Sequence, residues 1–120
     1  MALRLGAVVL DCPDPAALAE FYAAVLGRQV APHDAGGGWV DVPDPEGGPS
    51  VSFQLDPAFR PPTWPEGERP QMLHLDIVVT DLDAEHERVV GLGARLVDDT
   101  HATFRVYLDP AGHPFCLCAC

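Results

Sequence analysis

Two polar side chains stand in an otherwise apolar segment of the second half of the chain, and their types could do chemistry. His74 and Asp76 alternate with apolar residues in the segment LHLDIVV, residues 73–79. On a β-strand, residues two apart lie on one face, so the imidazole and the carboxylate would be neighbours. Such a pair could hydrogen-bond a ligand or act as acid and base. No Ser-His-Asp order, phosphate-binding glycine loop or closely paired acidic motif indicates a competing kind of catalysis.

The cysteine thiols are the second group that could do chemistry. Cys12 stands alone, whereas Cys116, Cys118 and Cys120 alternate at the end of the sequence. On a strand these three would share a face about 7 Å apart, beyond the usual reach of a disulfide. We therefore expect free thiols, as in a reducing cytosol. A metal site built on this CxCxC pattern would need ligands from elsewhere in the chain, so small apolar residues on a terminal strand are the simpler interpretation.

The segment that carries His74 has a counterpart in the first half of the chain. Residues 6–27 and 73–93 each read as an apolar strand, a turn with an aspartate, and a helix that ends in Leu-Gly. The motif DPEGGP, which starts at Asp44, returns as DPAGHP, which starts at Asp109. It follows the helix-start aspartate by 30 residues in the first half and by 28 in the second. Two landmarks that recur in order at similar spacing indicate an internal duplication.

Each half is predicted to form a β-α-β-β-β module within an α+β fold. In the first module, at about residues 3–55, the expected strands are 4–10, 28–32, 39–42 and 50–55, with a helix from Asp14-Pro15 to Leu26. In the second, at about residues 73–120, they are 73–79, 94–97, 103–108 and 115–120, with a helix at 83–92. The proline-rich segment 56–72 reads as an ordered linker, because it contains Phe59 and Trp64.

The alternation in the segment 73–79 predicts which side chains enter a cavity. Its odd-numbered residues are all apolar and should lie under the helix. His74, Asp76 and Val78 then face the opposite way, into whatever the sheets enclose. The corresponding positions of the first half are Ala7, Val9 and Asp11.

Aromatic residues are further candidates for a ligand site. Trp39 and Phe53 lie on expected strands near the first-half cavity, where they could form walls for a flat ligand or could simply pack in the core. Strand parity puts Gln54 and Phe53 on opposite faces, so at most one of them lines the cavity. Trp64 in the linker could form a lid or a subunit contact, or could anchor the linker.

The composition limits the classes of partner. The chain has 120 residues, 48% hydrophobic and 21% charged, which suits one globular domain. Its formal net charge of −11, with seven Lys plus Arg, would repel nucleic acid and anionic lipid. With no long apolar run or signal-like start, we expect a cytoplasmic protein without a membrane span.

The motifs together resemble the glyoxalase, bleomycin-resistance and extradiol-dioxygenase superfamily, the vicinal oxygen chelate fold. The resemblance rests on the paired modules and on the segments DPAALAEFYAAVLG, HLDIVVTDLD and DPAGHPFCL, and it covers nearly the whole chain. It is closest to glyoxalase-like proteins of actinobacterial type, in which a proline-rich linker with a tryptophan is also familiar. The resemblance implies a single glyoxalase-like domain over residues 1–120, with two modules that form incomplete barrels around a cavity, and commonly a homodimer.

The resemblance also implies where a metal would bind. Metal-dependent members usually place a His seven residues before each helix-start aspartate and a Glu near the end of the last strand. In this chain the second His position is His74, but the first is Ala7 and the Glu position is Cys116. A catalytic metal generally needs three protein ligands and an open position. We therefore expect no metal and no other cofactor, unless Cys116, Asp76 or Asp11 supplies the missing ligands.

These observations favour a metal-independent protein that binds a small organic molecule, as resistance proteins of the superfamily do when they sequester drugs. The acidic composition would favour a cationic ligand. The candidate ligand-binding residues are His74, Asp76, Trp39, Phe53, Trp64 and Cys116. Whether the chain is an enzyme stays open. The alternatives are a metal-dependent lyase or dioxygenase with an unusual ligand set, a metal-free isomerase that uses His74 or Asp76, and a noncatalytic interaction domain.

Overall fold

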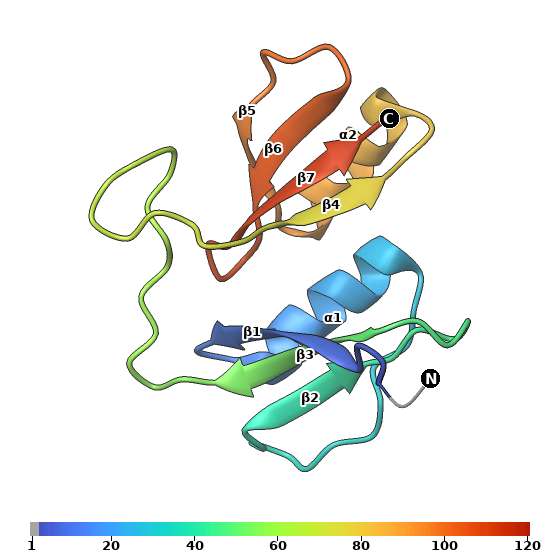
Figure 1. Ribbon diagram of the computed structural model, residues 1–120, viewed down its shortest axis with the longest axis vertical. Helices are drawn as coiled ribbons and strands as arrows, with labels where there is room; N and C mark the ends of the chain where they lie inside the picture. Colours follow the sequence, from blue (N-terminus) through green and yellow to red (C-terminus); the bar gives the residue numbers. More distant parts are fainter. Residues whose placement is uncertain (1–2) are drawn as a thin grey trace. The chain divides into compact units, whose positions relative to one another are not determined.

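A computed structural model describes residues 3–120 of the chain (Figure 1). The chain forms two compact units, and the boundary between them lies between Phe59 and Arg60, inside the expected linker. Each unit contains one open sheet and one helix. The structure thus confirms an α+β fold built from two tandem modules, in which neither sheet closes into a barrel.

The first unit has a three-stranded sheet in the order β1-β3-β2. Its elements are β1 (Ala7–Cys12), α1 (Pro15–Leu26), β2 (Trp39–Val42) and β3 (Ser50–Leu55). Strand β3 pairs in parallel with β1 and antiparallel with β2. The helix packs on this sheet, and its apolar side chains form most of the core of the unit.

Helix α1 begins and ends where its capping residues predict. The Asp14 side chain accepts a hydrogen bond from the Ala17 amide, and Pro15 occupies the first turn, where its missing N–H costs nothing. Gly27 ends the helix at φ 67°, in the left-handed region that favours glycine. The helical spacing of Leu18, Phe21, Tyr22, Val25 and Leu26 predicts one apolar stripe that packs on a sheet. The first four of these residues are buried and Leu26 is half-buried, which confirms the stripe.

The first unit departs from the prediction at residues 28–32, which do not form a regular strand. One backbone hydrogen bond, from the Ala31 amide to the Asp41 carbonyl, holds this segment beside β2. The next residue is Pro32, which has no N–H to continue a ladder. The first unit therefore keeps three regular strands.

The second unit has the complete β-α-β-β-β order. Its elements are β4 (Leu75–Val78), α2 (Leu82–Leu92), β5 (Arg95–Asp98), β6 (Phe104–Leu108) and β7 (Pro114–Cys118). The sheet order is β4-β7-β6-β5, in which β4 and β7 are parallel and the other pairs are antiparallel. Strand β4 is therefore at an edge, next to β7 (Figure 1).

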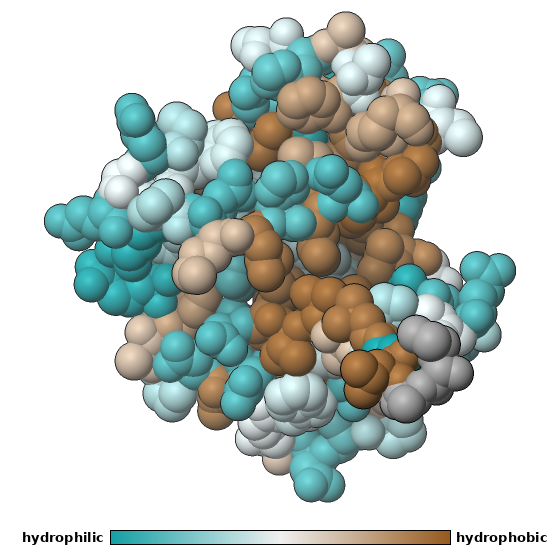
Figure 2. Space-filling model, viewed as in Figure 1, coloured by the Kyte–Doolittle hydropathy of each residue, from teal (hydrophilic) through white to brown (hydrophobic). Residues whose placement is uncertain are grey.

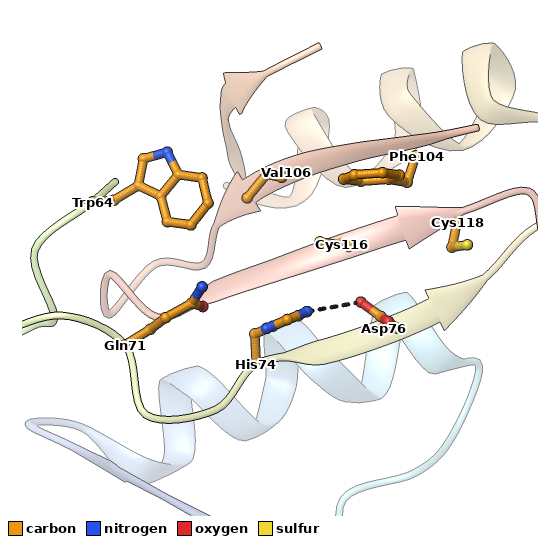
Figure 3. Close-up of a pocket in the computed structure, with 8 residues that line it drawn as sticks. All are labelled: Trp64, Gln71, His74, Asp76, Phe104, Val106, Cys116 and Cys118. Atoms are coloured by element: carbon orange, nitrogen blue, oxygen red, sulfur yellow. Dashed lines mark ion pairs between the residues drawn. The ribbon is translucent and has the colours of Figure 1, made fainter. Parts of the chain in front are cut away.

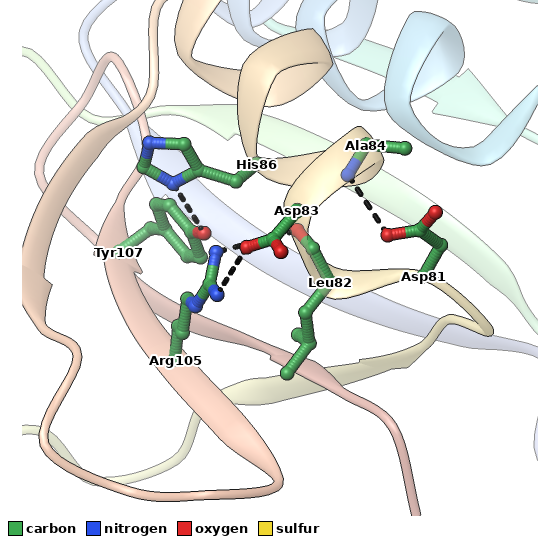
Figure 4. A network of polar contacts seen from close by, with 7 residues as sticks. All are labelled: Asp81, Leu82, Asp83, Ala84, His86, Arg105 and Tyr107. Carbon is green, nitrogen blue, oxygen red and sulfur yellow. Dashed lines mark hydrogen bonds and ion pairs between the residues drawn. The ribbon is translucent and has the colours of Figure 1, made fainter.

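Helix α2 is held to its sheet largely by polar contacts. The sequence pattern predicts that Leu82, His86, Val89 and Val90 form the inward face of this helix. Of the residues of α2 only Val89 is buried, and Val90 is 42% exposed, so the prediction is wrong for Val90. The His86 imidazole hydrogen-bonds the Tyr107 hydroxyl at 2.9 Å, and the Arg105 guanidinium donates to the Asp83 carboxylate at 2.7 Å (Figure 4). These contacts compensate for the small apolar face of the helix.

The surface of both units mixes apolar and polar side chains in the view of Figure 2. Exposed apolar residues of the second unit include Leu73 at 58% and Val78 at 71%. Leu73 was expected under the helix, but it precedes the first residue of β4 and so lies outside the alternating pattern. Within residues 3–120, neither helix has the length and hydrophobicity needed to cross a bilayer.

Candidate functional site

A pocket of about 270 Å³ opens on the sheet of the second unit (Figure 3). It lies over strands β4, β7 and β6, and residues of the linker contribute one wall. The lining residues are Trp64, Gln71, His74, Asp76, Phe104, Val106, Cys116 and Cys118. Four of the six predicted site residues, His74, Asp76, Trp64 and Cys116, are thus brought together.

Strand register explains why these side chains share a face. Asp76 pairs with Cys116 across β4 and β7, and Cys116 pairs with Val106 across β7 and β6. Asp76, Cys116 and Val106 thus form one row across the sheet, and the paired residues Cys118 and Phe104 form the next row. Because directly paired residues point to the same side of a sheet, the two rows build the floor of the pocket.

His74 and Asp76 form an ion pair at the open edge of this floor. Nε2 of His74 lies 3.1 Å from Oδ1 of Asp76 (Figure 3). The predicted alternation is confirmed for residues 74–78, since His74, Asp76 and Val78 are exposed while Leu75 and Ile77 are half-buried. Of the three exposed residues, His74 and Asp76 line the pocket and Val78 does not. With exposed fractions of 40% and 61%, both polar side chains can reach a ligand and can also change rotamer.

Cys116 is the buried residue among the four predicted site residues that line the pocket. Its side chain is 6% exposed, and burial raises the pKa of its thiol to about 11. The negative charge of Asp76 raises this pKa further, because it disfavours a thiolate beside it. At neutral pH Cys116 is therefore a protonated thiol and a poor nucleophile.

The other two cysteines of the terminal segment form a disulfide. Cys118 is bonded to Cys120, and their Cα atoms lie 5.4 Å apart. The expectation that no disulfide forms is therefore wrong for this pair, whereas Cys12 and Cys116 form no disulfide within residues 3–120. The physical reason is that β7 ends at Cys118, so Cys120 lies outside the extended geometry on which the 7 Å separation was based.

Two linker residues complete the pocket. Trp64 presents an aromatic wall, and Gln71 lies at the start of the segment that leads into β4 (Figure 3). Oε1 of Gln71 is buried and accepts no hydrogen bond within residues 3–120. A buried amide oxygen without a donor is unfavourable, so this atom is suited to receive an N–H or O–H group from a ligand.

Trp39 and Phe53, the other two predicted site residues, belong to the first unit and do not line this pocket. Phe53 is fully buried and stacks on Tyr22 with ring centroids 5.7 Å apart, so it packs in the core of its unit. Trp39 is 45% exposed, and its indole N–H donates to the Asp41 carboxylate at 2.8 Å. As strand parity predicted, Gln54 is exposed on the face opposite Phe53.

Sequence reasoning missed Gln71, Phe104, Val106 and Cys118. Phe104 and Val106 are two residues apart, as are Cys116 and Cys118, so the sequence alone indicates that the members of each pair share a face of a strand. That these pairs share a face with Asp76 depends on the register between strands. Gln71 has no periodic signal, because it lies in an irregular segment.

Comparison with known proteins gives the family. None of the curated protein sequences matches the chain. Among solved structures, a glyoxalase/bleomycin resistance protein/dioxygenase family enzyme from Burkholderia phytofirmans PsJN is similar at 19% identity, with a TM-score of 0.74, over 96% of this chain and 97% of that one. A glyoxalase/dioxygenase from Nostoc punctiforme is similar at 17% identity, with a TM-score of 0.72, over 95% of this chain and 88% of that one.

A possible glyoxalase from Bacillus cereus gives a TM-score of 0.69 at 16% identity, over 98% of this chain and all of that one. At these identities the similarity establishes the fold alone. The family follows from a sequence model, that of the glyoxalase-like domain, which matches residues 7–118. With nearly its whole length matched, the chain belongs to the glyoxalase-like domain family.

Proposed function

We propose that this glyoxalase-like protein binds a small organic molecule in the pocket of its second unit. The observation that carries the proposal is Oε1 of Gln71, a buried acceptor that has no donor within residues 3–120 and belongs to a pocket-lining side chain. Trp64 and Phe104 add aromatic surface, and Asp76 adds a carboxylate. Few polar groups in a mostly apolar pocket are typical of small-molecule sites.

The proposed ligand has a flat apolar body and at least one N–H or O–H donor. The apolar body would contact the aromatic side chains, and the donor would satisfy Gln71. A positive charge would favour binding, because Asp76 lies in the pocket and the whole chain carries a net charge of −11. A pocket of about 270 Å³ suits a metabolite-sized molecule, and it would hold only part of a large glycopeptide drug.

Binding of this ligand is proposed to need no metal. The ligand set that the family resemblance implies does not fit this chain: Ala7 offers no donor atom, and Cys116 is a thiol instead of a carboxylate. The contacts proposed above come from side chains alone. Protein that has been treated with a chelator should therefore bind the ligand as well as untreated protein does.

Tryptophan fluorescence provides the test, because the chain has two tryptophans and only Trp64 lines the pocket. The variant Trp39→Phe keeps Trp64 as its one emitter, and it would be titrated with a panel of planar amines, planar neutral alcohols and basic glycopeptides. A saturable change with at least one planar amine is expected. Trp64→Phe, which keeps Trp39, is the matched control and should give no change.

Gln71→Leu should weaken binding of the best compound about ten-fold, the effect of one lost hydrogen bond to a buried acceptor. Gln54→Leu, an exposed glutamine of the first unit, is its control and should leave binding unchanged. No response of Trp64 to any member of the panel, or an equal response in Trp39→Phe and Trp64→Phe, would contradict the proposal.

A metal-free isomerase is the second candidate function. The observation that favours it is the 3.1 Å contact between His74 and Asp76, because a carboxylate that orients an imidazole is a common arrangement for proton transfer. Exchange of a substrate C–H proton with deuterium, lost in His74→Gln and retained in His113→Gln, would identify this activity. Lack of exchange with every compound that binds would reject it.

The proposal includes a homodimer in the cytoplasm, and it keeps the actinobacterial subtype indicated by the linker tryptophan. Light scattering of the purified protein at several concentrations tests the dimer. A mass equal to 12.9 kDa at all concentrations would contradict it.

A further inference from the structure

A second cleft, of about 520 Å³, lies in the second unit beside the pocket described above. Its floor comes from β5 and β6, with Arg95, Val97 and Leu108, and its walls come from the linker and from the DPAGHP turn. We propose that this cleft binds a small organic anion, and that the Arg95 guanidinium holds the carboxylate of that anion while the apolar walls contact its body.

Strand register places this cleft on the same face of the sheet as the pocket. Arg95 is directly paired with Leu108 across β5 and β6. Leu108 follows Val106 by two residues on β6, and Val106 lines the pocket, so these side chains point to one side of the sheet. Trp64 lines both the pocket and the cleft, which are therefore neighbours on this face.

The linker wall of the cleft is held in place by contacts within the second unit. Nε of Arg69 donates to the Pro61 carbonyl at 3.0 Å, and the Thr63 amide donates to the Arg69 carbonyl at 2.7 Å. Pro61 also packs closely on the DPAGHP turn, where a Cβ at Gly112 would lie 2.7 Å from Cβ of Pro61. A ligand thus meets a wall that is already ordered, which lowers the entropic cost of binding.

Arg95 is the basic residue of the lining, and its guanidinium makes no salt bridge within residues 3–120. Arg28, Arg69, Arg88 and Arg105, in contrast, each have an acidic partner within 3.8 Å. Arg95 is exposed, so its N–H donors are accessible from the cleft. The fork of donors on a guanidinium matches the two oxygens of a carboxylate, which it can bind in a bidentate manner.

Asp109 is the acidic residue of the lining, but its carboxylate is engaged by the DPAGHP turn. Its Oδ1 accepts hydrogen bonds from the backbone amides of Ala111, Gly112 and His113. The Asp109 residue is 4% exposed, so little of it faces the cleft. Arg95 therefore stays available for an anion from solution.

The rest of the lining selects the body of the ligand. Pro62, Trp64, Val97 and Leu108 are half-buried and offer apolar surface beside the cation. Because the guanidinium is exposed, its ion pair contributes modestly, and the apolar contact must supply much of the affinity. A monocarboxylate with an aromatic ring is therefore the expected class, whereas inorganic phosphate, which has no apolar body, should bind more weakly.

Tryptophan fluorescence tests the proposal in the full-length variant Trp39→Phe, in which Trp64 is the one emitter. A titration with 3-phenylpropanoate should give a saturable change, and an equal concentration of inorganic phosphate should not displace this compound. The absence of a saturable change with 3-phenylpropanoate would overturn the proposal. Displacement by phosphate would contradict the role of the apolar walls.

A pair of arginine variants identifies the group that holds the carboxylate. In the Trp39→Phe background, Arg95→Met should weaken binding of 3-phenylpropanoate about ten-fold and should not change binding of the neutral analogue 3-phenylpropanol. Arg4→Met removes the same charge from an exposed position of the first unit and should change neither affinity. Unchanged affinity for 3-phenylpropanoate in Arg95→Met, or an equal loss in Arg4→Met, would overturn the assignment.

Gln71→Leu separates this cleft from the pocket of the proposed function, because Gln71 lines the pocket and not the cleft. This variant should weaken binding of a planar amine and leave binding of 3-phenylpropanoate unchanged, and Arg95→Met should do the reverse. Either proposal can thus fail while the other holds. Equal weakening of 3-phenylpropanoate binding in Gln71→Leu and Arg95→Met would overturn the assignment of the carboxylate to a separate cleft.

Discussion

Asp76 on β4 lies directly opposite Cys116 on β7, so the sheet of the second unit places a carboxylate beside a buried thiol. This arrangement keeps the thiol protonated at neutral pH, because both burial and the negative charge raise its pKa. Both residues also line the pocket of the second unit.

Ionisation of Cys116 should destabilise the protein at alkaline pH. Its pKa is about 11 in the folded protein and 9.0 is its ordinary value, so the folded state holds the proton more tightly. The resulting stabilisation is fully present below pH 9 and is lost as the pH rises through 11, with a slope of at most about 1.4 kcal/mol per pH unit.

Urea denaturation of wild-type protein and Cys116→Ala at several pH values from 8 to 11 would measure this slope. Burial also raises the pKa of Tyr107, which contributes to alkaline destabilisation in both proteins. The relevant quantity is therefore the difference between the two proteins in how steeply the free energy of unfolding falls with pH, and the wild type should show the steeper fall. Parallel curves for the two proteins would show that Cys116 does not titrate in this range.

Removal of the Arg105 guanidinium should weaken the attachment of α2 to β6. Arg105 donates to the Asp83 carboxylate at 2.7 Å and to the Leu82 carbonyl at 3.4 Å, at the start of the helix (Figure 4). The hydrogen bond from Arg105 to the Asp83 carboxylate lowers the pKa of Asp83. We expect Arg105→Met to lower the urea midpoint at neutral pH.

The pH dependence of that effect distinguishes the ion pair from general loss of packing. Because the pKa of Asp83 is lowered on folding from its ordinary value of 3.8, its stabilisation is present above that value and is lost as the pH falls through the folded pKa. The difference between Arg105→Met and the wild type should therefore shrink in acid. Arg95→Met on β5, for which no salt bridge is found within residues 3–120, should show no such convergence.

Deletion of the Tyr107 hydroxyl should remove its part-buried hydrogen bond with His86 and leave the ring in place. The hydroxyl contacts Nδ1 of His86 at 2.9 Å, and the ring stacks on Phe115 with centroids 5.4 Å apart. Tyr107→Phe should lower the free energy of unfolding by about 1 kcal/mol. Tyr107→Leu, which also loses the stacked ring, should cost more, and equal costs would mean that the stacking on Phe115 adds no measurable stability.

The repeated DP-x-G turn offers a test of how the two halves differ. Gly47 and Gly112 occupy the same turn position at φ 86° and 98°, where an L side chain is strained. A Cβ at Gly47 would meet nothing within 4 Å, whereas one at Gly112 would lie 2.7 Å from Cβ of Pro61.

We therefore expect Gly47→Ala to lower the free energy of unfolding by about 1–2 kcal/mol through backbone strain alone. Gly112→Ala should lower it by about 1–3 kcal/mol more, because Pro61 must move. Thermal or urea unfolding of the two variants measures the difference. Equal losses of free energy of unfolding in the two variants would mean that backbone strain alone causes them and that the contact with Pro61 adds nothing.

Local patterns in the sequence determined the elements and the faces of this protein. The duplication, the caps of α1 at Asp14 and Gly27, and the exposed face shared by His74 and Asp76 could all be predicted. Each depends on residues a few positions apart, where the periods of helix and strand and the special conformations of proline and glycine act directly. Pro32, the last residue of the expected strand 28–32, also acts locally, because it has no N–H to continue a ladder.

Only the tertiary structure decided which of these faces meet. Asp76 lies opposite Cys116 because of the register between β4 and β7, although the two residues are forty positions apart in the sequence. Register depends on packing against the rest of the sheet. Packing also buries Phe53 in the core of the first unit. It leaves Oε1 of Gln71 buried without a hydrogen-bond donor within residues 3–120. The chemistry of the site was thus visible in its residues, but their assembly required long-range contacts that no local pattern encodes.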